Sequence, residues 1–161
     1  MDLKDPIVRL KRAEPVDRDV FANLLQFYLY DLATDLSFSV GRDGRFEYTY
    51  LDRFWRHPYL FLVEEQIAGF ALAIDECPIS GKKPCLFMAE FFVLRGHRRK
   101  GVGETAANAI LKLHSGLWHI GVIQRNADAS AFWSKVLACC NTVASSHHFD
   151  GEDWQLHEFQ T

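Results

Sequence analysis

A short basic segment stands between a run of residues typical of a strand and a run typical of a helix. It covers Arg95–Gly103 and reads Arg-Gly-His-Arg-Arg-Lys-Gly-Val-Gly, after an expected strand at 86–94 and before an expected helix at 104–114. Cations placed just before a helix oppose the helix dipole, at about 0.3–1 kcal/mol each. An anionic ligand would reverse this penalty, because glycines let the backbone approach a phosphate and a helix N-terminus attracts negative charge. The segment therefore predicts a phosphate-binding loop rather than a solvated basic turn, which is the usual meaning of a charge run.

Three kinds of glycine loop compete for Gly101 and Gly103. A Walker A loop is excluded because no Gly-Lys-Ser/Thr follows. The dinucleotide fingerprint G-x-G-x-x-G/A is satisfied formally by Gly101, Gly103 and Ala106. That fingerprint places its first glycine directly after the strand, whereas six residues separate Leu94 from Gly101 here, and no acidic residue follows at the distance that would hold a ribose.

The third kind rests on a resemblance to a known family. Residues 92–103 resemble the acetyl-CoA-binding motif of the GNAT N-acetyltransferase superfamily, Arg/Gln-x-x-Gly-x-Gly/Ala after a strand, with Arg98, Gly101 and Gly103 at the matching positions. A second segment, Asn126-x-x-Ala129-x-x-Phe132-Trp133, resembles the family's Asn-x-x-Ala-x-x-Phe/Leu-Tyr helix start. The two motifs occur in the family's order, and the likeness covers roughly residues 59–143.

The resemblance implies an enzyme that passes an acetyl group from acetyl-CoA directly to an amine, without a metal. Backbone N–H groups of residues 98–103 would hold the pyrophosphate, and the open strand edge at Phe92 and Val93 would pair with pantetheine. Asn126 would contact the cofactor's arm. The cofactor-binding residues implied in this way are Phe92, Val93, Arg98, Arg99, Lys100, Gly101, Val102, Gly103, Asn126 and Trp133.

Glu90 is the predicted catalytic base. It is the one carboxylate in the expected strand 86–94, whose other residues are apolar, and a carboxylate is expensive to bury without a partner. Direct acetyl transfer needs a base that makes the amine neutral, and burial among aromatic residues would raise the pKa of Glu90 toward the range that suits this task. The structural alternative is a carboxylate that meets solvent or an arginine.

Trp133 stands where the family usually has a tyrosine that acts as the general acid. An indole N–H can donate a hydrogen bond, but it is not an acid at physiological pH. The resemblance therefore supplies no general acid for this chain. The thiolate would leave unprotonated, take its proton from water, or use another group such as Ser134.

Tyr28 and Asp31 are the predicted substrate-binding residues. They lie near the end of the first expected helix, where the helix dipole disfavours an acid, so Asp31 is a candidate for binding a cationic amine. The alternative, that both are surface polar residues beside core aromatics, stays open. The acceptor is expected to be a primary amine of a small molecule, with peptide N-termini and lysine side chains as further candidates. A non-catalytic acyl-CoA sensor or interaction module, which Trp133 favours, and a dinucleotide-binding protein are the rival hypotheses.

Length and composition indicate one globular domain over residues 1–161. With 48% hydrophobic residues, 24% charged residues and a net charge of −3, the chain is neither disordered nor basic enough for a nucleic-acid-binding surface along its length. Its four cysteines lack metal-ligand spacing, and no window reaches the length of a membrane span. We therefore expect a cytoplasmic monomer or homodimer without metal, nucleic-acid or membrane partners.

Hydrophobic periodicity and turn residues predict the elements that position these groups. Helices are expected from Asp17, as a cap, to about Leu32, and over 48–55, 104–114 and 127–139. Strands are expected at 7–10, 59–64, 66–74, 86–94, 117–124, 142–147 and 154–159, with a bulge at Gly69. Antiparallel hairpins together with a strand–helix–strand crossover indicate an α+β fold with a mixed, mostly antiparallel sheet flanked by helices, which the GNAT resemblance also implies.

Overall fold

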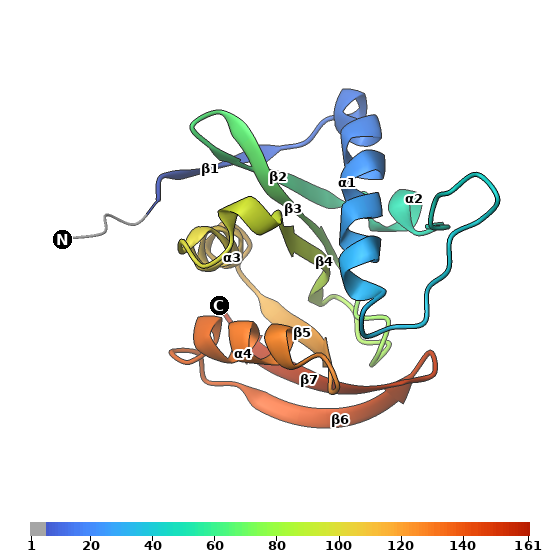
Figure 1. Ribbon diagram of the computed structural model, residues 1–161. Coiled ribbons are helices and arrows are strands. Elements are labelled where there is room, and N and C mark those ends of the chain that lie inside the picture. Colours follow the sequence, from blue (N-terminus) through green and yellow to red (C-terminus); the bar gives the residue numbers. More distant parts are fainter. Residues whose placement is uncertain (1–5) are drawn as a thin grey trace.

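A seven-stranded sheet forms the centre of the protein (Figure 1). The computed structural model describes residues 6–161. The strand order is β1-β2-β3-β4-β5-β7-β6, and only β4 and β5 run parallel. The strands are β1 Val8–Arg12, β2 His57–Val63, β3 Gln66–Ile74, β4 Leu86–Val93, β5 Leu117–Ile123, β6 Val143–Phe149 and β7 Glu152–Gln160. The predicted α+β fold with a mostly antiparallel sheet is confirmed.

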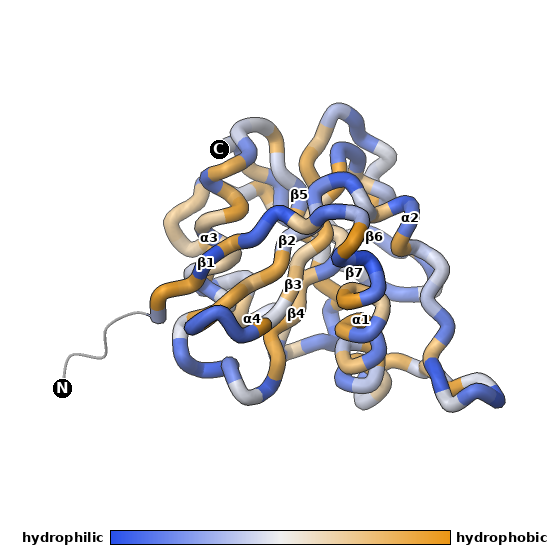
Figure 2. The backbone as a smooth tube through the Cα atoms, turned by 90° about the horizontal axis from the view of Figure 1, so that it is seen from above, coloured by the Kyte–Doolittle hydropathy of each residue, from blue (hydrophilic) through white to orange (hydrophobic). Residues whose placement is uncertain are grey.

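Helices cover both faces of this sheet. They are α1 Arg18–Leu32, α2 Leu51–Phe54, α3 Val102–Leu113 and α4 Ala127–Val136. Each pair of helices packs on the sheet through its own apolar cluster. One cluster joins α3 and α4 to the sheet through residues such as Ile110 and Trp133, and the other joins α1 and α2 to it through residues such as Phe21 and Phe54. Hydrophobic residues accordingly concentrate in the central strands, while the connecting loops are largely hydrophilic (Figure 2).

The parallel strands β4 and β5 separate soon after they begin. They pair only at Leu86 with Trp118 and at Phe87 with His119, although β4 continues to Val93 and pairs with β3 along its length. The connection between them is a crossover through α3, as the sequence predicts. The second half of β4 therefore faces β5 across a split in the middle of the sheet.

Gly69 allows β3 to approach β4 closely. A Cβ atom at this position would lie 2.2 Å from the Phe92 carbonyl oxygen and 2.8 Å from the Phe61 ring. The register between β2 and β3 shifts here, because Phe61 pairs with Gly69 whereas Leu62 pairs with Ile67. The bulge expected at Gly69 is therefore present, and it lies directly opposite the end of β4.

Two local predictions were wrong. The helix expected over 48–55 is reduced to the single turn of α2, and β2 begins at His57, two residues before the strand start expected at 59. Asp17 does not cap α1 with its side chain; its carboxylate accepts hydrogen bonds from Lys11 and from the Glu14 N–H. These interactions hold the short 3-10 turn that precedes α1. Within residues 6–161, no helix is both long and apolar enough to cross a membrane.

We expect Gly69→Ala to lower the free energy of unfolding by about 1–3 kcal/mol, because the new methyl group overlaps backbone atoms of β4 that cannot rotate away. Urea denaturation measures this change. Gly96→Ala is the matched control, since a Cβ at Gly96 meets nothing within 4 Å. Equal stability of the two variants would show that the close approach at Gly69 is not needed.

Candidate active site

The loop before α3 offers unpaired backbone donors. Gly101 is the N-terminal cap of α3, has a φ of 78° and brings no side chain to cap the helix. Thr105 donates its N–H to the Gly101 carbonyl at 3.0 Å, which begins the helical hydrogen bonds. Within the described chain, the N–H groups of Val102, Gly103 and Glu104 have no protein acceptor. Such a helix N-terminus suits a phosphate group, which can accept these hydrogen bonds and gains from the helix dipole.

The cations of this loop are mostly engaged within the protein. Arg98 donates from Nε to the Val93 carbonyl at 2.7 Å and from Nη2 to Asp31 at 2.8 Å. Arg95 donates from Nε and Nη2 to the other oxygen of Asp31, at 3.0 and 2.7 Å. Lys100 bonds the Gly96 carbonyl at 2.8 Å. Arg99 has a φ of 57° and, among residues 6–161, no side-chain hydrogen bond or ion pair.

Asp31 therefore lies at the phosphate loop, where it bridges two arginines. Burial raises the pKa of Asp31, but the hydrogen bonds from Arg98 and Arg95 outweigh this effect and leave the pKa below its usual value. Its unfavourable place at the end of α1 is offset by these two cations. The predicted role in binding a cationic amine stays a prediction, and the two ion pairs argue against it, since both carboxylate oxygens are already occupied.

Gly103 is also required by packing, while its predicted close approach to a phosphate stays a prediction. A Cβ there would lie 3.0 Å from the Phe132 ring and 3.3 Å from Val93. Gly103 thus lets the start of α3 pack against α4 and β4. Gly101 is the glycine with the left-handed backbone, which a side chain would strain.

The open edge of β4 is formed by Val93 rather than by Phe92. The Leu94 N–H bonds the Ala68 carbonyl in β3 at 2.8 Å, and the Phe92 carbonyl also faces β3 at Gly69. Because successive residues of a strand face opposite sides, the N–H and C=O of Val93 face the split. Arg98 bonds this carbonyl. The structure thus directs the main chain of Phe92 away from the split, and its ring packs against Tyr28 and Phe70.

Glu90 lies in the diverging part of β4 beside two phenols. The Tyr48 hydroxyl donates to Glu90 Oε1 at 2.9 Å, and the Tyr28 hydroxyl also interacts with this carboxylate. Burial raises the pKa of Glu90 to about 7, although the two tyrosine contacts act in the opposite direction. Burial and the negative charge of Glu90 in turn raise the pKa values of Tyr28 and Tyr48, so both phenols stay protonated. Tyr28 and Glu90 are thus brought together, whereas the role of Tyr48 is one that the sequence did not reveal.

Asn126 lies at the start of α4, and Trp133 lies in its second half. The Trp133 ring is buried and packs edge-on against Phe91 in β4, with ring centroids 5.2 Å apart. Asn126 caps α4, because its side-chain oxygen accepts the Ala129 N–H at 3.1 Å. Ser134, the substitute acid considered from the sequence, is exposed. The cofactor contacts expected of Trp133 and Asn126 stay predictions.

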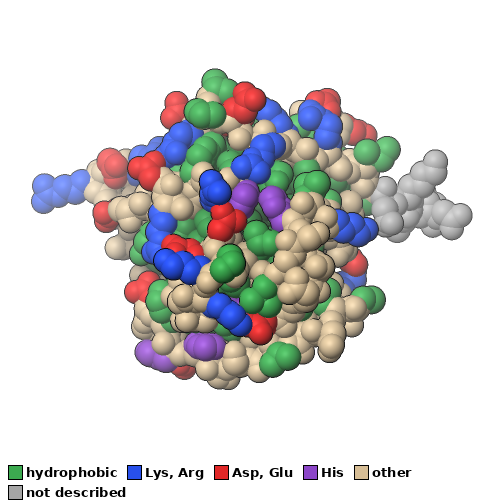
Figure 3. Space-filling view, turned by 180° about the vertical axis from the view of Figure 1, so that it is seen from behind, with side chains coloured by type: hydrophobic (Ala, Val, Ile, Leu, Met, Phe, Trp, Pro, Cys, Tyr) green, Lys and Arg blue, Asp and Glu red, His purple; other side chains and the backbone are tan. Residues whose placement is uncertain are grey.

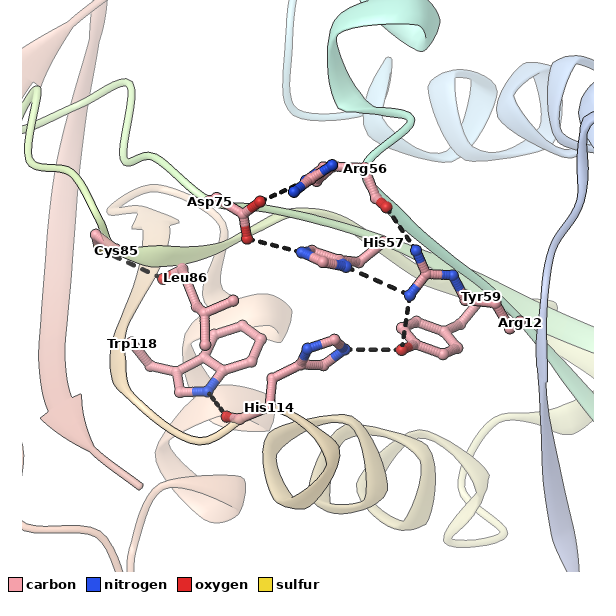
Figure 4. Close-up of polar contacts among 9 residues, drawn as sticks. All are labelled: Arg12, Arg56, His57, Tyr59, Asp75, Cys85, Leu86, His114 and Trp118. Carbon is pink, nitrogen blue, oxygen red and sulfur yellow. Dashed lines mark hydrogen bonds and ion pairs between the residues drawn. The ribbon is translucent and has the colours of Figure 1, made fainter.

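A second polar cluster lies at the opposite end of α3 from the phosphate loop. His57 bonds Asp75 at 2.7 Å, His114 bonds the Tyr59 hydroxyl at 2.7 Å, and the two imidazole rings are 4.6 Å apart (Figure 4). Burial, followed by the charges of His57 and Arg12, lowers the pKa of His114. Histidines also reach the surface near the middle of the rear face, beside basic and acidic side chains (Figure 3). The cluster ties the start of β2 to the ends of β3 and α3, and it contains none of the predicted site residues.

The sequence of the chain matches the model of the GNAT acetyltransferase family over residues 27–138. This match includes Glu90, the phosphate loop and the start of α4. The chain belongs to the GNAT acetyltransferase family. The predicted acetyl-CoA-dependent acetyltransferase is thereby confirmed at the level of the family. A search of curated proteins finds no match.

Solved structures share the GNAT fold at low sequence identity. A GNAT-family acetyltransferase from Streptococcus agalactiae is 12% identical, with a TM-score of 0.71 over 96% of this chain and 95% of that one. The structure of yncA from Salmonella typhimurium, with its cofactor acetyl-CoA, is 11% identical in sequence. Its TM-score is 0.61, and the match covers 95% of this chain and 93% of that one. The spermidine/spermine N-acetyltransferase SpeG from Vibrio cholerae is 15% identical, with a TM-score of 0.59 over 96% and 95%.

The residues of this GNAT protein fit a bound acetyl-CoA. The N–H groups at the start of α3, which have no acceptor among residues 6–161, and the left-handed Gly101 suit its phosphates. The Val93 N–H, which faces the split beside the carbonyl bonded by Arg98, suits its amide-containing arm. Within residues 6–161, no three His, Cys, Asp or Glu side chains are placed to hold a metal ion.

We expect Arg98→Lys to weaken CoA binding about tenfold. The Arg98 guanidinium donates to the Val93 carbonyl and to Asp31 at the same time, and one ammonium group cannot reproduce this geometry. Titration calorimetry with CoA measures the dissociation constant. Arg99→Lys keeps the same charge at a side chain without such bonds, and its dissociation constant should change by less than about twofold. A similar loss in both variants would show that Arg98 acts by charge alone.

The raised pKa of Glu90 predicts a gain in stability on its removal. Between the usual pKa of 4.5 and about 7, the unfolded chain releases a proton that the folded protein retains, so stability falls as pH rises through this window. The full penalty is present above pH 7. Glu90→Gln should therefore raise the free energy of unfolding at pH 8 by on the order of 2 kcal/mol, after allowance for partial solvent exposure, with a smaller gain at pH 5. Urea denaturation at both pH values measures this, and a loss of stability at pH 8 would contradict it.

Proposed function

We propose that this GNAT protein acetylates a primary amine of a small molecule, with Glu90 as the base. The observation that carries this proposal is the Glu90 carboxylate, which lies in the diverging part of β4, faces two protonated phenols and has a pKa of about 7. No cation neutralises it among the residues that the structure describes. Such a carboxylate is poised to accept a proton near neutral pH, because its charged and neutral forms have similar free energies there.

The proposed reaction uses residues of β4 together with the start of α3, α1 and the segment before α2. Acetyl-CoA, when bound, supplies the acetyl group as a thioester. The N–H groups of Val102 and Gly103 would bind its phosphates, and the Val93 N–H would bind its arm. Glu90 would accept a proton from the ammonium form of the acceptor, directly or through water, and so produce the nucleophilic amine. Tyr28 and Tyr48 would hold the Glu90 carboxylate in place and stabilise its charge once it is ionised.

Trp133 limits what this protein can use as a general acid. Its indole can donate a hydrogen bond but does not release a proton near neutral pH. We therefore expect the sulfur leaving group to depart as a thiolate or to take its proton from water. This departure from the family's tyrosine is also the feature that favours the second candidate function, a sensor that binds acyl-CoA without turnover.

The acceptor proposed here is a small amine rather than a protein. The likeness to SpeG, whose name identifies spermidine and spermine as substrates, supports this class at the level of the fold. The aromatic side chains of Tyr28, Tyr48 and Tyr50 near Glu90 can contact an alkylamine chain and its charge. Asp31 is not assigned to the acceptor, because it is engaged by Arg95 and Arg98.

Release of free CoA from acetyl-CoA, measured with a panel of amines, tests the proposal. The panel should contain alkyl polyamines, amino acids and lysine-containing peptides. We expect turnover with at least one small amine, whereas a sensor would bind CoA without turnover with any of them. Preference for the peptides would favour a protein N-acetyltransferase instead.

The pH dependence of this turnover should identify the base. Activity of the wild type should rise with pH around 7, as Glu90 ionises. Glu90→Gln should lose about tenfold to a thousandfold in kcat, keep its affinity for acetyl-CoA and lose this limb of the profile. Tyr48→Phe removes a contact that lowers the pKa of Glu90, so the limb should move to higher pH with the base retained. Identical profiles for all three proteins would assign Glu90 a structural role.

A further inference from the structure

A serine, a histidine and a glutamate lie in one hydrogen-bonded row outside the acetyl-transfer site. Ser80 belongs to the loop between β3 and β4, His119 to β5 and Glu158 to β7. The Ser80 hydroxyl lies 3.4 Å from His119 Nδ1, and His119 Nε2 lies 2.7 Å from Glu158 Oε2. The two strand residues are direct partners in the register of β5 and β7. The sheet therefore fixes the histidine and the glutamate, and the loop brings the serine to them.

The hydrogen bonds define which nitrogen of His119 carries the proton. A glutamate carboxylate can only accept, and hydrogen bonds from His119 and Lys82 hold the pKa of Glu158 below its usual value. The proton of neutral His119 is therefore on Nε2, which donates to Glu158. Nδ1 is left with a lone pair toward the Ser80 hydroxyl. The nitrogen that faces the serine is therefore unprotonated, as a base must be, although in the serine–histidine–aspartate template that nitrogen is Nε2 and the carboxylate holds Nδ1.

The environment of the row suits a reaction. The His119 side chain is only 2% exposed, whereas Ser80 is exposed, so the base is shielded and the nucleophile is accessible. Ser80, His119 and Glu158 border a cavity of about 440 Å³ that opens to solvent. The Lys82 N–H lies 3.2 Å from the Ser80 hydroxyl oxygen, and the Lys82 ammonium lies 3.2 Å from Glu158. The Lys82 N–H thus reaches the nucleophile's oxygen, and the Lys82 ammonium helps to hold Glu158 as an anion.

From this geometry we propose a second catalytic site, in which Ser80 is the nucleophile, His119 the base and Glu158 the residue that orients the base, acting on esters of small carboxylic acids. The cavity has room for a small acyl group, and a distance of 3.4 Å between nucleophile and base is ordinary before a substrate binds. The proposed acetyl transfer at Glu90 uses none of these residues. The second site therefore goes beyond the acetyltransferase function.

The proposed step balances without any further reagent than water. Ser80 Oγ attacks the ester carbonyl carbon and forms a new O–C bond, while His119 Nδ1 takes the hydroxyl proton. The bond from this carbon to the alcohol oxygen breaks, and Nδ1 returns the proton to the leaving alcohol. Water then attacks the acyl-serine with His119 again as the base, which releases the carboxylic acid and restores Ser80.

A neighbouring serine provides a matched control. Ser145 borders the same cavity and bonds His147 Nε2 at 2.8 Å. Unlike His119, His147 has no carboxylate partner among residues 6–161. Ser145→Ala therefore removes a serine that lies closer to its histidine than Ser80 does, at 2.8 against 3.4 Å, but without the third member of the row.

Covalent labelling of the full chain with a fluorophosphonate probe tests the proposal. Mass spectrometry should find an adduct on Ser80 in the wild type and in Ser145→Ala, and none in Ser80→Ala. Glu158→Gln should label at least about tenfold more slowly, because an amide no longer fixes the proton on Nε2. Hydrolysis of 4-nitrophenyl acetate should follow the same order. An unlabelled wild type, an adduct elsewhere, or equal labelling in Glu158→Gln would overturn the proposal.

The affinity for CoA separates this proposal from the acetyltransferase function. Ser80 is exposed, and the hydrogen-bond partners of its hydroxyl, His119 and Lys82, lie outside the phosphate loop, so Ser80→Ala should keep the melting temperature and the CoA affinity of the wild type. Loss of labelling with unchanged CoA binding supports the second site. A wild type that binds CoA but resists the probe removes the second site and leaves the acetyltransferase function untouched.

Discussion

The separation of β4 from β5 is the constraint on which the site depends. The parallel pairing ends after Phe87 and His119, so backbone N–H and C=O groups of the later β4 residues have no partner in β5. Buried backbone groups of this kind need other hydrogen-bond partners. Arg98 bonds the Val93 carbonyl and thereby covers part of this edge. The same arginine bonds Asp31 at the end of α1. The open edge, the phosphate loop and the first helix are therefore held by one side chain.

Two carboxylates near this edge have opposite environments. Asp31 faces Arg95 and Arg98 and remains charged, whereas Glu90 faces only neutral phenols and has a raised pKa. If Arg98 reached Glu90 instead, the carboxylate would be held as an anion and would be a weaker base. Asp31 thus pairs with both arginines of the loop, whereas the contacts of Glu90 are with Tyr28 and Tyr48. In many active sites, two carboxyl groups differ in pKa because their surroundings differ, and this difference decides which of them exchanges protons.

The sequence predicted the helices and strands whose hydrophobic periodicity is strong. It also predicted features whose residues are close together in the chain. The hairpin of β2 and β3, the crossover through α3 and the phosphate loop all depend on residues close together in the chain. Tyr48 was assigned to a helix, since its aromatic neighbours resemble a helical face, but it lies in the segment that reaches Glu90 across 42 positions. The partners of Asp31 lie 64 and 67 positions away. Contacts of this range follow from the sheet order, which no local pattern contains.

The last parallel pair of β4 and β5 also links the two sites. His119 is the β5 residue at which pairing ends, and Trp118 and Ile120 on either side of it point to the opposite face, into the cluster beneath α3 and α4. The alternation of a strand therefore sends His119 to the face where the loop carrying Ser80 lies. That loop is anchored close by, since Ile79 occupies the space that a side chain at Gly121 would fill. A shift of β5 by one residue would move the start of the split and would also exchange His119 for an apolar residue, so the register of this one strand determines both sites.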